Sequence, residues 1–263
     1  MSNNRHQDND NQSTIPSDQT THFGFQEVKV AEKQGKVKQV FDSVAPNYDL
    51  MNDLMSMGLH RVWKKEALLL SQVRKGDRVL DLASGTADLG LALYDQVGDT
   101  GTVVLSDINA AMLQTGQERM DDKGYLRAQY ALANAESLPF ESESFDCITM
   151  AFGLRNVTDK SKALKEAHRV LKVGGRMIVL EFSKPPSHLF SKVYDFYSFQ
   201  FLPKLGQKFA KDADSYQYLA ESIRRHPDQE TLAGMMQEAG FEKVNYYNLT
   251  FGIVAIHRGY RVE

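Results

Sequence analysis

Short apolar runs alternate with helix-like stretches through the middle of the chain. The runs predict five strands, at Arg78–Leu82, Thr102–Asp107, Ala128–Ala133, Phe145–Ala151 and Arg176–Phe182. Apolar residues at helical spacing between them predict helices over Asp88–Val97, Ala110–Asp121 and Ser161–Leu171. Gly174 and Gly175 supply positive φ and are expected to end the last of these helices. Repeated strand–helix units imply a parallel, doubly wound sheet with right-handed crossovers.

The C-terminal part is expected to add a hairpin to this sheet. Asp228–Ala239 has the spacing of a helix ended by Gly240, and Glu242–Leu249 and Gly252–Val262 are typical of strands. The tight link Thr250-Phe251-Gly252 predicts a hairpin, so the final strand should run antiparallel. The expected fold class is therefore α/β: a Rossmann-like, doubly wound, seven-stranded sheet with an antiparallel last strand and helices on both faces.

The N-terminal part divides into a tail and two helices. Residues 1–20 are polar, with almost nothing to bury, and are expected to be a disordered tail before a single domain over residues 21–263. Val37, Val40, Phe41 and Val44 predict an amphipathic helix stopped by Pro46, and a second helix runs from Leu59 to Leu70. Tyr48–Met57 between them is expected to be irregular. The two helices would cap a ligand site or cover one face of the sheet.

Composition narrows the class of protein. A net charge of −3 over 263 residues gives no global reason to expect nucleic-acid binding. The single cysteine, Cys147, lies in an apolar run, where we expect a small buried residue and no disulfide. No apolar stretch approaches the roughly 20 residues that span a bilayer, and the polar N-terminus does not resemble a secretory signal. A cytoplasmic location is the expectation, and no metal site is predicted.

The loop after the first predicted strand indicates which ligand the sheet holds. A dinucleotide site favours Gly-x-Gly-x-x-Gly there, but the loop Ala83–Asp88 has only Gly85, and Asp88 stands where the helix begins. A pyrophosphate would meet that negative charge. S-adenosylmethionine has no phosphates and tolerates the acid, so the loop favours it as the ligand.

Further residues fit the same ligand. Gly85 would let the backbone approach it closely, and Thr86 would hydrogen-bond beside its methionine part. Asp107 ends the second predicted strand about 20 residues later, where an acid accepts from ribose hydroxyls. Asn134 and Ala135 follow the third strand and would meet the adenine edge. These five residues are the predicted cofactor site.

Several longer motifs point to a more specific class of enzyme. They are Tyr48–Trp63, Phe152–Asp159, Arg169–Ser183, His226–Gln229 and His257–Tyr260. These motifs resemble those of a known family, the ubiquinone/menaquinone biosynthesis C-methyltransferases (UbiE-like). The resemblance covers the chain from about Thr21 to its end, and its two long signatures are specific. In the loop, Ser84 and Ala87 replace two glycines common in the family.

The resemblance implies methylation of a ring carbon of a polyprenyl benzoquinol or naphthoquinol, with S-adenosylmethionine as donor. Such a carbon needs a proton acceptor, or groups that stabilise a phenolate, in a water-poor pocket. Arg155 stays protonated and is expected to stabilise the phenolate or orient a water, while Asn156 would hold a quinol oxygen. His60 and His226 both titrate near neutral pH, and either would serve as the base. His60 is taken as the catalytic candidate.

The aromatic stretch Leu189–Leu202 is a candidate for receiving the isoprenoid tail and for peripheral contact with a membrane. An apolar cover over the sheet explains the stretch equally well.

Two other functions remain open at this point. One is a nicotinamide-dependent oxidoreductase on the same sheet, against which the missing glycines argue. The other is a non-catalytic component of a quinone-synthesis assembly that binds the donor. Intact Arg155, Asn156 and His60 argue weakly against that second alternative.

Overall fold

The computed structural model describes residues 19–44, 48–185, 204, 207 and 212–263. The aromatic stretch Leu189–Leu202 and residues 1–18 of the predicted tail lie outside the described residues. Thr20, expected in the tail, is already the first residue of a strand. None of the helices in the described ranges has the length and apolar character needed to span a membrane.

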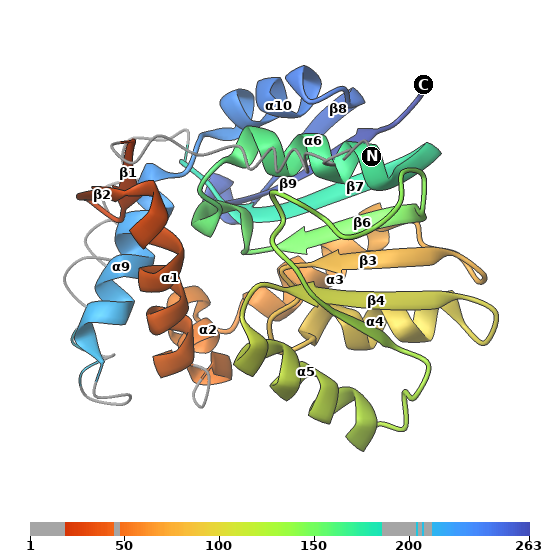
Figure 1. Cartoon of the computed structure of the whole chain (residues 1–263), viewed down its shortest axis with the longest axis horizontal. Helices are drawn as coiled ribbons and strands as arrows, with labels where there is room; N and C mark the ends of the chain where they lie inside the picture. The colour runs from red at the N-terminus through yellow and green to blue at the C-terminus, as the bar shows by residue number, and fades with distance from the viewer. Residues whose placement is uncertain (1–18, 45–47, 186–203, 205–206, 208–211) are drawn as a thin grey trace, which may run out of the picture.

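The main sheet has seven strands in the order β5-β4-β3-β6-β7-β9-β8 (Figure 1). The first five of these run parallel, and β9 pairs antiparallel with both β7 and β8. The predicted fold class, with its antiparallel last strand, is confirmed. The strands are β3 Arg78–Leu82, β4 Thr102–Asp107, β5 Gln129–Leu132, β6 Phe145–Ala151, β7 Leu171–Phe182, β8 Glu242–Leu249 and β9 Val254–Tyr260.

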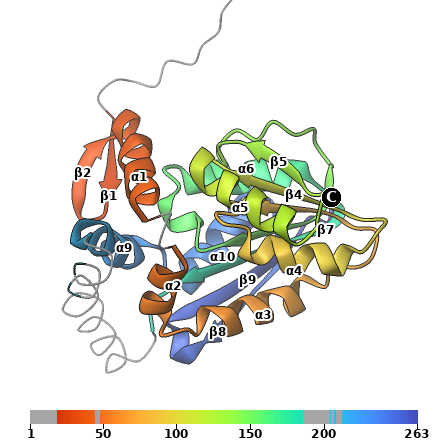
Figure 2. The same cartoon turned by 90° about the horizontal axis from the view of Figure 1, so that it is seen from below.

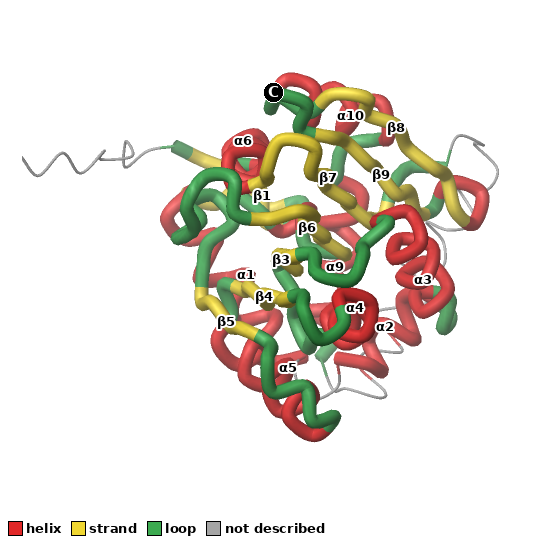
Figure 3. The backbone as a smooth tube through the Cα atoms, turned by 90° about the vertical axis from the view of Figure 1, so that its right-hand side faces the viewer, coloured by secondary structure: helices red, strands yellow, loops and turns green. Residues whose placement is uncertain are grey.

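Helices cover both faces of this sheet, as Figure 3 shows along the strands. Three lie on one face: α3 His60–Ser71, α4 Asp88–Val97 and α5 Ala110–Asp122. Two lie on the other: α6 Lys160–Val170 and α10 Gln229–Glu238.

A third group of elements gathers at the carboxyl edge of the parallel strands (Figures 1 and 2). It consists of the hairpin β1 Thr20–Phe23 and β2 Gln26–Lys29 with the helices α1 Val30–Val44, α2 Tyr48–Ser56 and α9 Ala213–Arg225. Two short 3-10 turns, η2 Leu154–Asn156 and η4 Thr250–Gly252, follow β6 and β8.

Alternation along the strands explains the two packed layers. Successive side chains of a strand point to opposite faces. Val79 of β3 accordingly packs in the cluster that contains residues of α3, α4 and α5, while Leu80 packs in the cluster that contains residues of α6 and α10. Both are fully buried. The strands are therefore apolar on both faces, as expected of a parallel sheet between two layers of helices.

Two local predictions are wrong. Tyr48–Met57 is not irregular, because Tyr48–Ser56 forms α2. Met51 and Met55, one helical turn apart, are both buried, and this packing outweighs the poor helix propensity of the neighbouring Asn and Asp residues. The last crossover helix also ends before the glycines, at Val170, and β7 begins at once. Gly174 instead makes a turn within β7 at φ +81°, where its N–H donates to the carbonyl of Arg261.

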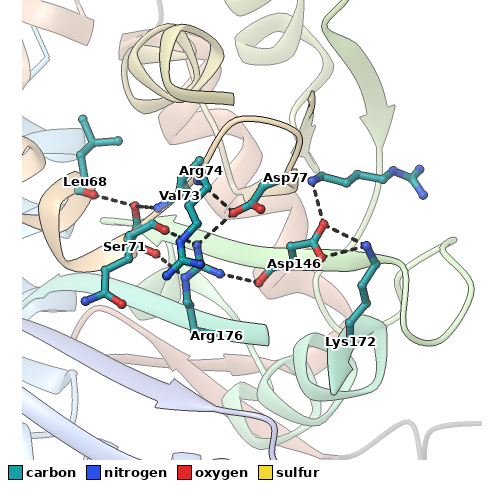
Figure 4. Close-up of polar contacts among 10 residues, drawn as sticks. Leu68, Ser71, Val73, Arg74, Asp77, Asp146, Lys172 and Arg176 are labelled. Atoms are coloured by element: carbon teal, nitrogen blue, oxygen red, sulfur yellow. Dashed lines mark hydrogen bonds and ion pairs between the residues drawn. The ribbon is translucent and has the colours of Figure 1, made fainter. Parts of the chain in front are cut away.

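Arg176 fastens the end of α3 to the amino edge of the sheet (Figure 4). Its guanidinium donates to the carbonyls of Ser71 and Gln72 at the end of α3 and pairs with Asp77 at 3.1 Å. It also donates to the carbonyl of Asp146 at 3.2 Å. Arg176 belongs to the second family signature, Arg169–Ser183, so at least one residue of that signature stabilises the fold.

Candidate functional site

A cavity of about 250 Å³ opens where the chain reverses its direction across the sheet. The chain runs outward from β3 through β4 to β5, then returns to β6 on the other side of β3. Ligands of doubly wound sheets bind at such a switch point, beyond the carboxyl ends of the strands. The volume far exceeds the roughly 10–15 Å³ that a buried water requires. It is the volume of a small-molecule site.

Four of the five residues predicted to bind the cofactor line this cavity: Gly85, Asp107, Asn134 and Ala135. The loops that carry them follow β3, β4 and β5, so strands distant in sequence bring them together. Gly85 has φ +54°, a left-handed conformation, and an added Cβ would lie 3.4 Å from Cε of Met112 and 3.7 Å from the hydroxyl of Tyr48. A Cβ would thus fit in ordinary contact with these side chains, and it is the left-handed backbone that favours glycine here.

Asp107 joins two of these loops. One carboxylate oxygen accepts from the amide of Gly85 and the other from the amide of Asn109, both at 2.8 Å. Burial raises the pKa of Asp107, and those amide donors oppose the shift. Each oxygen keeps a lone pair, and the side chain still lines the cavity. Asp107 thus has free acceptor capacity at the place where a ribose was predicted.

Thr86 does not lie where we predicted. It is buried outside the lining of the cavity, and its hydroxyl and carbonyl oxygens accept from Arg119 at 2.9 and 2.8 Å. Arg119 also pairs with Asp88 at 2.7 Å, and Lys64 pairs with the other oxygen of Asp88 at 2.7 Å. The carboxylate of Asp88 is therefore neutralised by two cations, so the expected repulsion of a pyrophosphate is much weaker than the sequence indicated. We call Lys64, Asp88 and Arg119 the loop clamp.

The two predicted catalytic residues after β6 are placed differently. Asn156 lines the cavity, and its Oδ1 accepts from the hydroxyl of Tyr218 on α9 at 3.0 Å. Arg155 is buried outside the cavity lining, where Nη1 pairs with Glu181 at 2.9 Å and also donates to the carbonyl of Phe152. Glu181 thus holds the guanidinium of Arg155 outside the lining of the cavity, and the role of Arg155 toward a phenolate or a water stays a prediction.

His60, the predicted base, lies away from the cavity. Its ring is buried at the start of α3, and Nε2 contacts Oδ1 of Asp53 on α2 at 3.0 Å. Burial lowers the pKa of His60. We therefore assign His60 to the α2–α3 junction rather than to proton transfer. His226, the other candidate, is 2% exposed at the end of α9, and neither of its ring nitrogens has a hydrogen-bond partner among the described residues.

The sequence predicted the helix α1 but did not predict that it forms a wall of the cavity. Val30, Gln34, Val37 and Phe41 of this helix line the cavity opposite the sheet. The predicted amphipathic helix therefore caps the site, although its sequence did not distinguish a cap from a cover for the sheet.

Glu181 was not among the residues predicted for the site. An acid inside the apolar run Ile178–Phe182 is nevertheless a signal that a buried partner exists.

A model of the ubiE/COQ5 methyltransferase family matches residues 28–261. The chain belongs to this family. It is 60% identical to the ubiquinone/menaquinone biosynthesis C-methyltransferase UbiE of Klebsiella pneumoniae (strain 342), over 93% of this chain and 98% of that one. UbiE of Xanthomonas campestris pv. campestris is 59% identical over 92% of this chain and 96% of the relative.

Solved methyltransferases share the fold of this ubiE/COQ5 family member at low identity. A SAM-dependent methyltransferase from Thermotoga maritima superimposes with a TM-score of 0.61 at 20% identity, covering 86% of this chain and 99% of that one. Another from Aquifex aeolicus gives 0.58 at 16% identity, covering 76% and 89%. The predicted resemblance is confirmed, and with it methyl transfer from S-adenosylmethionine as the class of reaction.

Proposed function

We propose that this enzyme methylates a ring carbon of a polyprenyl quinol, either a benzoquinol, a demethylmenaquinol or both. The observation that carries the proposal is the cavity at the switch point. Its donor side is formed by Gly85 and Asp107, and Asn156 lies on its other side. The UbiE relatives, at about 60% identity over nearly their full length, supply the class of acceptor.

The residues of the cavity fit the donor. Asp107 would offer two acceptor oxygens to the ribose hydroxyls, and Asn134 and Ala135, which also line the cavity, would meet the adenine edge. The space beside Gly85 is one that a Cβ would fill. Tyr48 lines the cavity, and an aromatic ring there would favour a sulfonium by cation–π attraction. When bound, S-adenosylmethionine supplies an electrophilic methyl group.

On the acceptor side, Asn156 would orient a quinol oxygen, with its own Oδ1 fixed by Tyr218. Methyl transfer requires the ring carbon in line with the sulfonium at near-attack distance, which a positioned amide supports. The cover formed by α1 would exclude water and so strengthen these polar contacts.

Quinone profiling tests this function. Cells lacking the protein should accumulate a demethylated quinone precursor, identified by mass spectrometry, and the native chain should restore the methylated product. Whether a demethylated benzoquinone, a demethylmenaquinone or both accumulate identifies the acceptor. An unchanged quinone pool would contradict the proposal. Calorimetry with S-adenosylhomocysteine and with NAD separates the two classes of enzyme. A methyltransferase should bind S-adenosylhomocysteine, and an oxidoreductase should bind NAD.

We further propose a cytoplasmic enzyme that touches the inner face of the membrane through Leu189–Leu202, the stretch that would receive the isoprenoid tail. Its aromatic density motivates the proposal. Sedimentation with lipid vesicles tests the membrane contact. The native protein should sediment with the vesicles, and the double variant Phe196→Ser/Phe199→Ser should sediment less. Equal sedimentation of both proteins would rule the stretch out as the contact. Recovery with other quinone-synthesis proteins instead of lipid would favour an assembly.

A further inference from the structure

Asn156 lines the cavity from η2, and only one of the two polar atoms of its amide has a partner among the described residues. Oδ1 accepts from the hydroxyl of Tyr218 at 3.0 Å. Nδ2 carries two hydrogens for donation and is unpaired within the described part of the chain. It is also not sealed from the surface, in contrast to the buried Nδ2 of Asn52. The donor end of the amide is therefore the end that is open to the cavity.

The hydroxyl proton of Tyr218 decides which way this amide points. Tyr218 is 4% exposed, and Asn156 is the one hydrogen-bond partner of its hydroxyl among the described residues. A buried tyrosine hydroxyl needs an acceptor for its proton, and of the two polar atoms of an amide only the oxygen accepts. Burial raises the pKa of Tyr218, so the hydroxyl keeps its proton at neutral pH. Oδ1 is thus held toward Tyr218.

The ring of Tyr218 is in turn held by the N-terminal hairpin. Phe23 of β1 stacks on it with ring centroids 4.1 Å and planes 16° apart. One helical turn later, Glu221 accepts from the amide of Phe25 at 2.9 Å. At Gly24, between these two contacts, an added Cβ would collide with the carboxylate of Glu221. The hairpin and α9, which lie together beside the sheet (Figure 2), therefore fix the position of the hydroxyl.

We infer that Tyr218 is a positioning residue for the methyl acceptor. It holds Asn156 with the amide N–H2 toward the cavity, and this makes the subsite one for a ring oxygen that carries no proton. A quinol hydroxyl would need an acceptor for its proton, which the amide in this orientation does not offer. The inference rests on the proposed methylation of a quinol, and it adds the ionisation state in which the acceptor is held.

A ring oxygen of this kind remains a hydrogen-bond acceptor throughout the reaction. The ring carbon of the ionised quinol bonds to the methyl carbon as the sulfonium–methyl bond breaks, so that a phenolate and a sulfonium become a dienone and a neutral thioether. Loss of the ring proton to water then restores the aromatic ring as a phenolate. Phenolate and dienone oxygens both accept from an N–H donor, so Asn156 need not turn between the steps.

Methyl transfer from labelled S-adenosylmethionine to a reduced short-chain demethylated quinol tests the role of Tyr218. Tyr218→Phe keeps the ring that stacks on Phe23 but frees the amide of Asn156 to turn over. We expect kcat/KM for the quinol to fall about 10-fold, as for one lost hydrogen bond. Affinity for S-adenosylhomocysteine, measured by calorimetry, should stay the same. Tyr216→Phe is the matched control, because the hydroxyl of this second buried tyrosine of α9 has no partner among the described residues.

A double-mutant cycle separates positioning from a general effect on the fold. Asn156→Ala should lower kcat/KM for the quinol about 100-fold, and adding Tyr218→Phe to it should cause no further loss, because Tyr218 acts through Asn156. Asn156→Asp tests the polarity of the subsite. It should be less active than Asn156→Ala, since it brings a negative charge to an ionised ring oxygen.

Each of four outcomes would overturn the inference: kcat/KM of Tyr218→Phe within about twofold of native, additive losses in the double variant, an equal loss of donor affinity, or Asn156→Asp at least as active as Asn156→Ala. If Tyr218→Phe does not fold, the comparison of Asn156→Asp with Asn156→Ala carries the test. If the native chain methylates neither a benzoquinol nor a naphthoquinol, the proposed function fails. If it does and Tyr218→Phe matches it, only the role of Tyr218 fails.

Discussion

Two buried carboxyls, Asp81 and Asp107, lie in the last two residues of neighbouring strands, but their surroundings give them different roles. Asp107 faces the cavity and holds two loop amides. Asp81 lies outside the lining of the cavity, where Oδ1 accepts from the hydroxyl of Thr149 at 2.8 Å and Oδ2 has no partner among the described residues. Burial raises the pKa of Asp81 to about 7. The first carboxyl is suited to a ligand, whereas the second affects stability.

Replacing Asp107 should weaken binding of the donor. Asp107→Asn removes the charge that would face the ribose, and the expected loss is about 1–3 kcal/mol, or roughly 5- to 150-fold in Kd. Calorimetry with S-adenosylhomocysteine measures it. Asp99→Asn, an exposed acid beyond α4 that pairs with Arg127, is the control and should bind as the native protein does. Unchanged affinity in Asp107→Asn would remove the ribose role.

Asp81 should make the protein less stable as the pH rises. Between about pH 4 and about pH 7 the folded state keeps the proton of Asp81 and the unfolded state loses it, so stability falls by about 1.4 kcal/mol for each pH unit. Above about pH 7 this contribution is constant. Asp81→Asn should therefore show a smaller decrease in urea midpoint between pH 5 and pH 8. Parallel curves for the two proteins would show that Asp81 is ionised throughout.

Sequence spacing located Asp107, Asn134 and Gly85, because each ends or follows a strand and the carboxyl ends of parallel strands meet at one edge of the sheet. It did not identify the partners of Arg155 and His60. Those depend on which side chains the fold brings opposite each other, such as Glu181, 26 residues after Arg155. The position of Thr86 was missed for the same reason, since Arg119 comes from a different helix.

At the scale of elements, the loop between β3 and α4 is held by ion pairs that join three helices. Lys64 of α3 and Arg119 of α5 reach Asp88 at the start of α4. The backbone of the loop is left-handed at Ala83, Gly85 and Ala87. Such conformations cost about 1–2 kcal/mol in a residue with a side chain. Ala87 stands where the family commonly has glycine, so the clamp maintains a loop that this sequence strains.

Arg119→Met should therefore loosen the loop and weaken donor binding about 10-fold, because Thr86 and Asp88 lose their shared partner and Gly85 is freer to move. Arg127→Met is the matched control. That arginine also bridges an acid and backbone carbonyls, but at the far end of α4. Calorimetry compares the two variants. An equal change in both, or none in Arg119→Met, would show that the clamp does not set the geometry of the site.

At the scale of the whole molecule, the N-terminal elements lie beside the sheet (Figure 2), and α1 lines the cavity opposite its strands. Phe23 of β1 stacks on Tyr218 of α9 with ring centroids 4.1 Å apart, and the ring hydroxyl of Tyr218 donates to Asn156. Asn109 beside the donor loop donates to Asp42 of α1 at 2.8 Å. The cover is thus tied to both the donor and the acceptor sides. The sequence predicted α1, but the contacts of this helix with α9 join segments over 160 residues apart.

Because α1 forms one wall of the cavity, binding of S-adenosylhomocysteine should slow hydrogen exchange in Val30–Val44. Amides of α10, which packs with α6 on the face of the sheet opposite α3, α4 and α5, should exchange at the same rate with or without the ligand. Mass spectrometry of peptic peptides reads both helices in one experiment. Equal exchange in α1 in the two states would show that the helix does not close over the donor.

The central claim is tested most directly by incubating the purified protein with S-adenosylmethionine labelled in its methyl group and a reduced short-chain demethylated quinol. The account predicts labelled quinol methylated on a ring carbon, with Asp107→Asn requiring more donor for the same rate. No labelled product from either a benzoquinol or a naphthoquinol, in a protein that binds the donor, would contradict it.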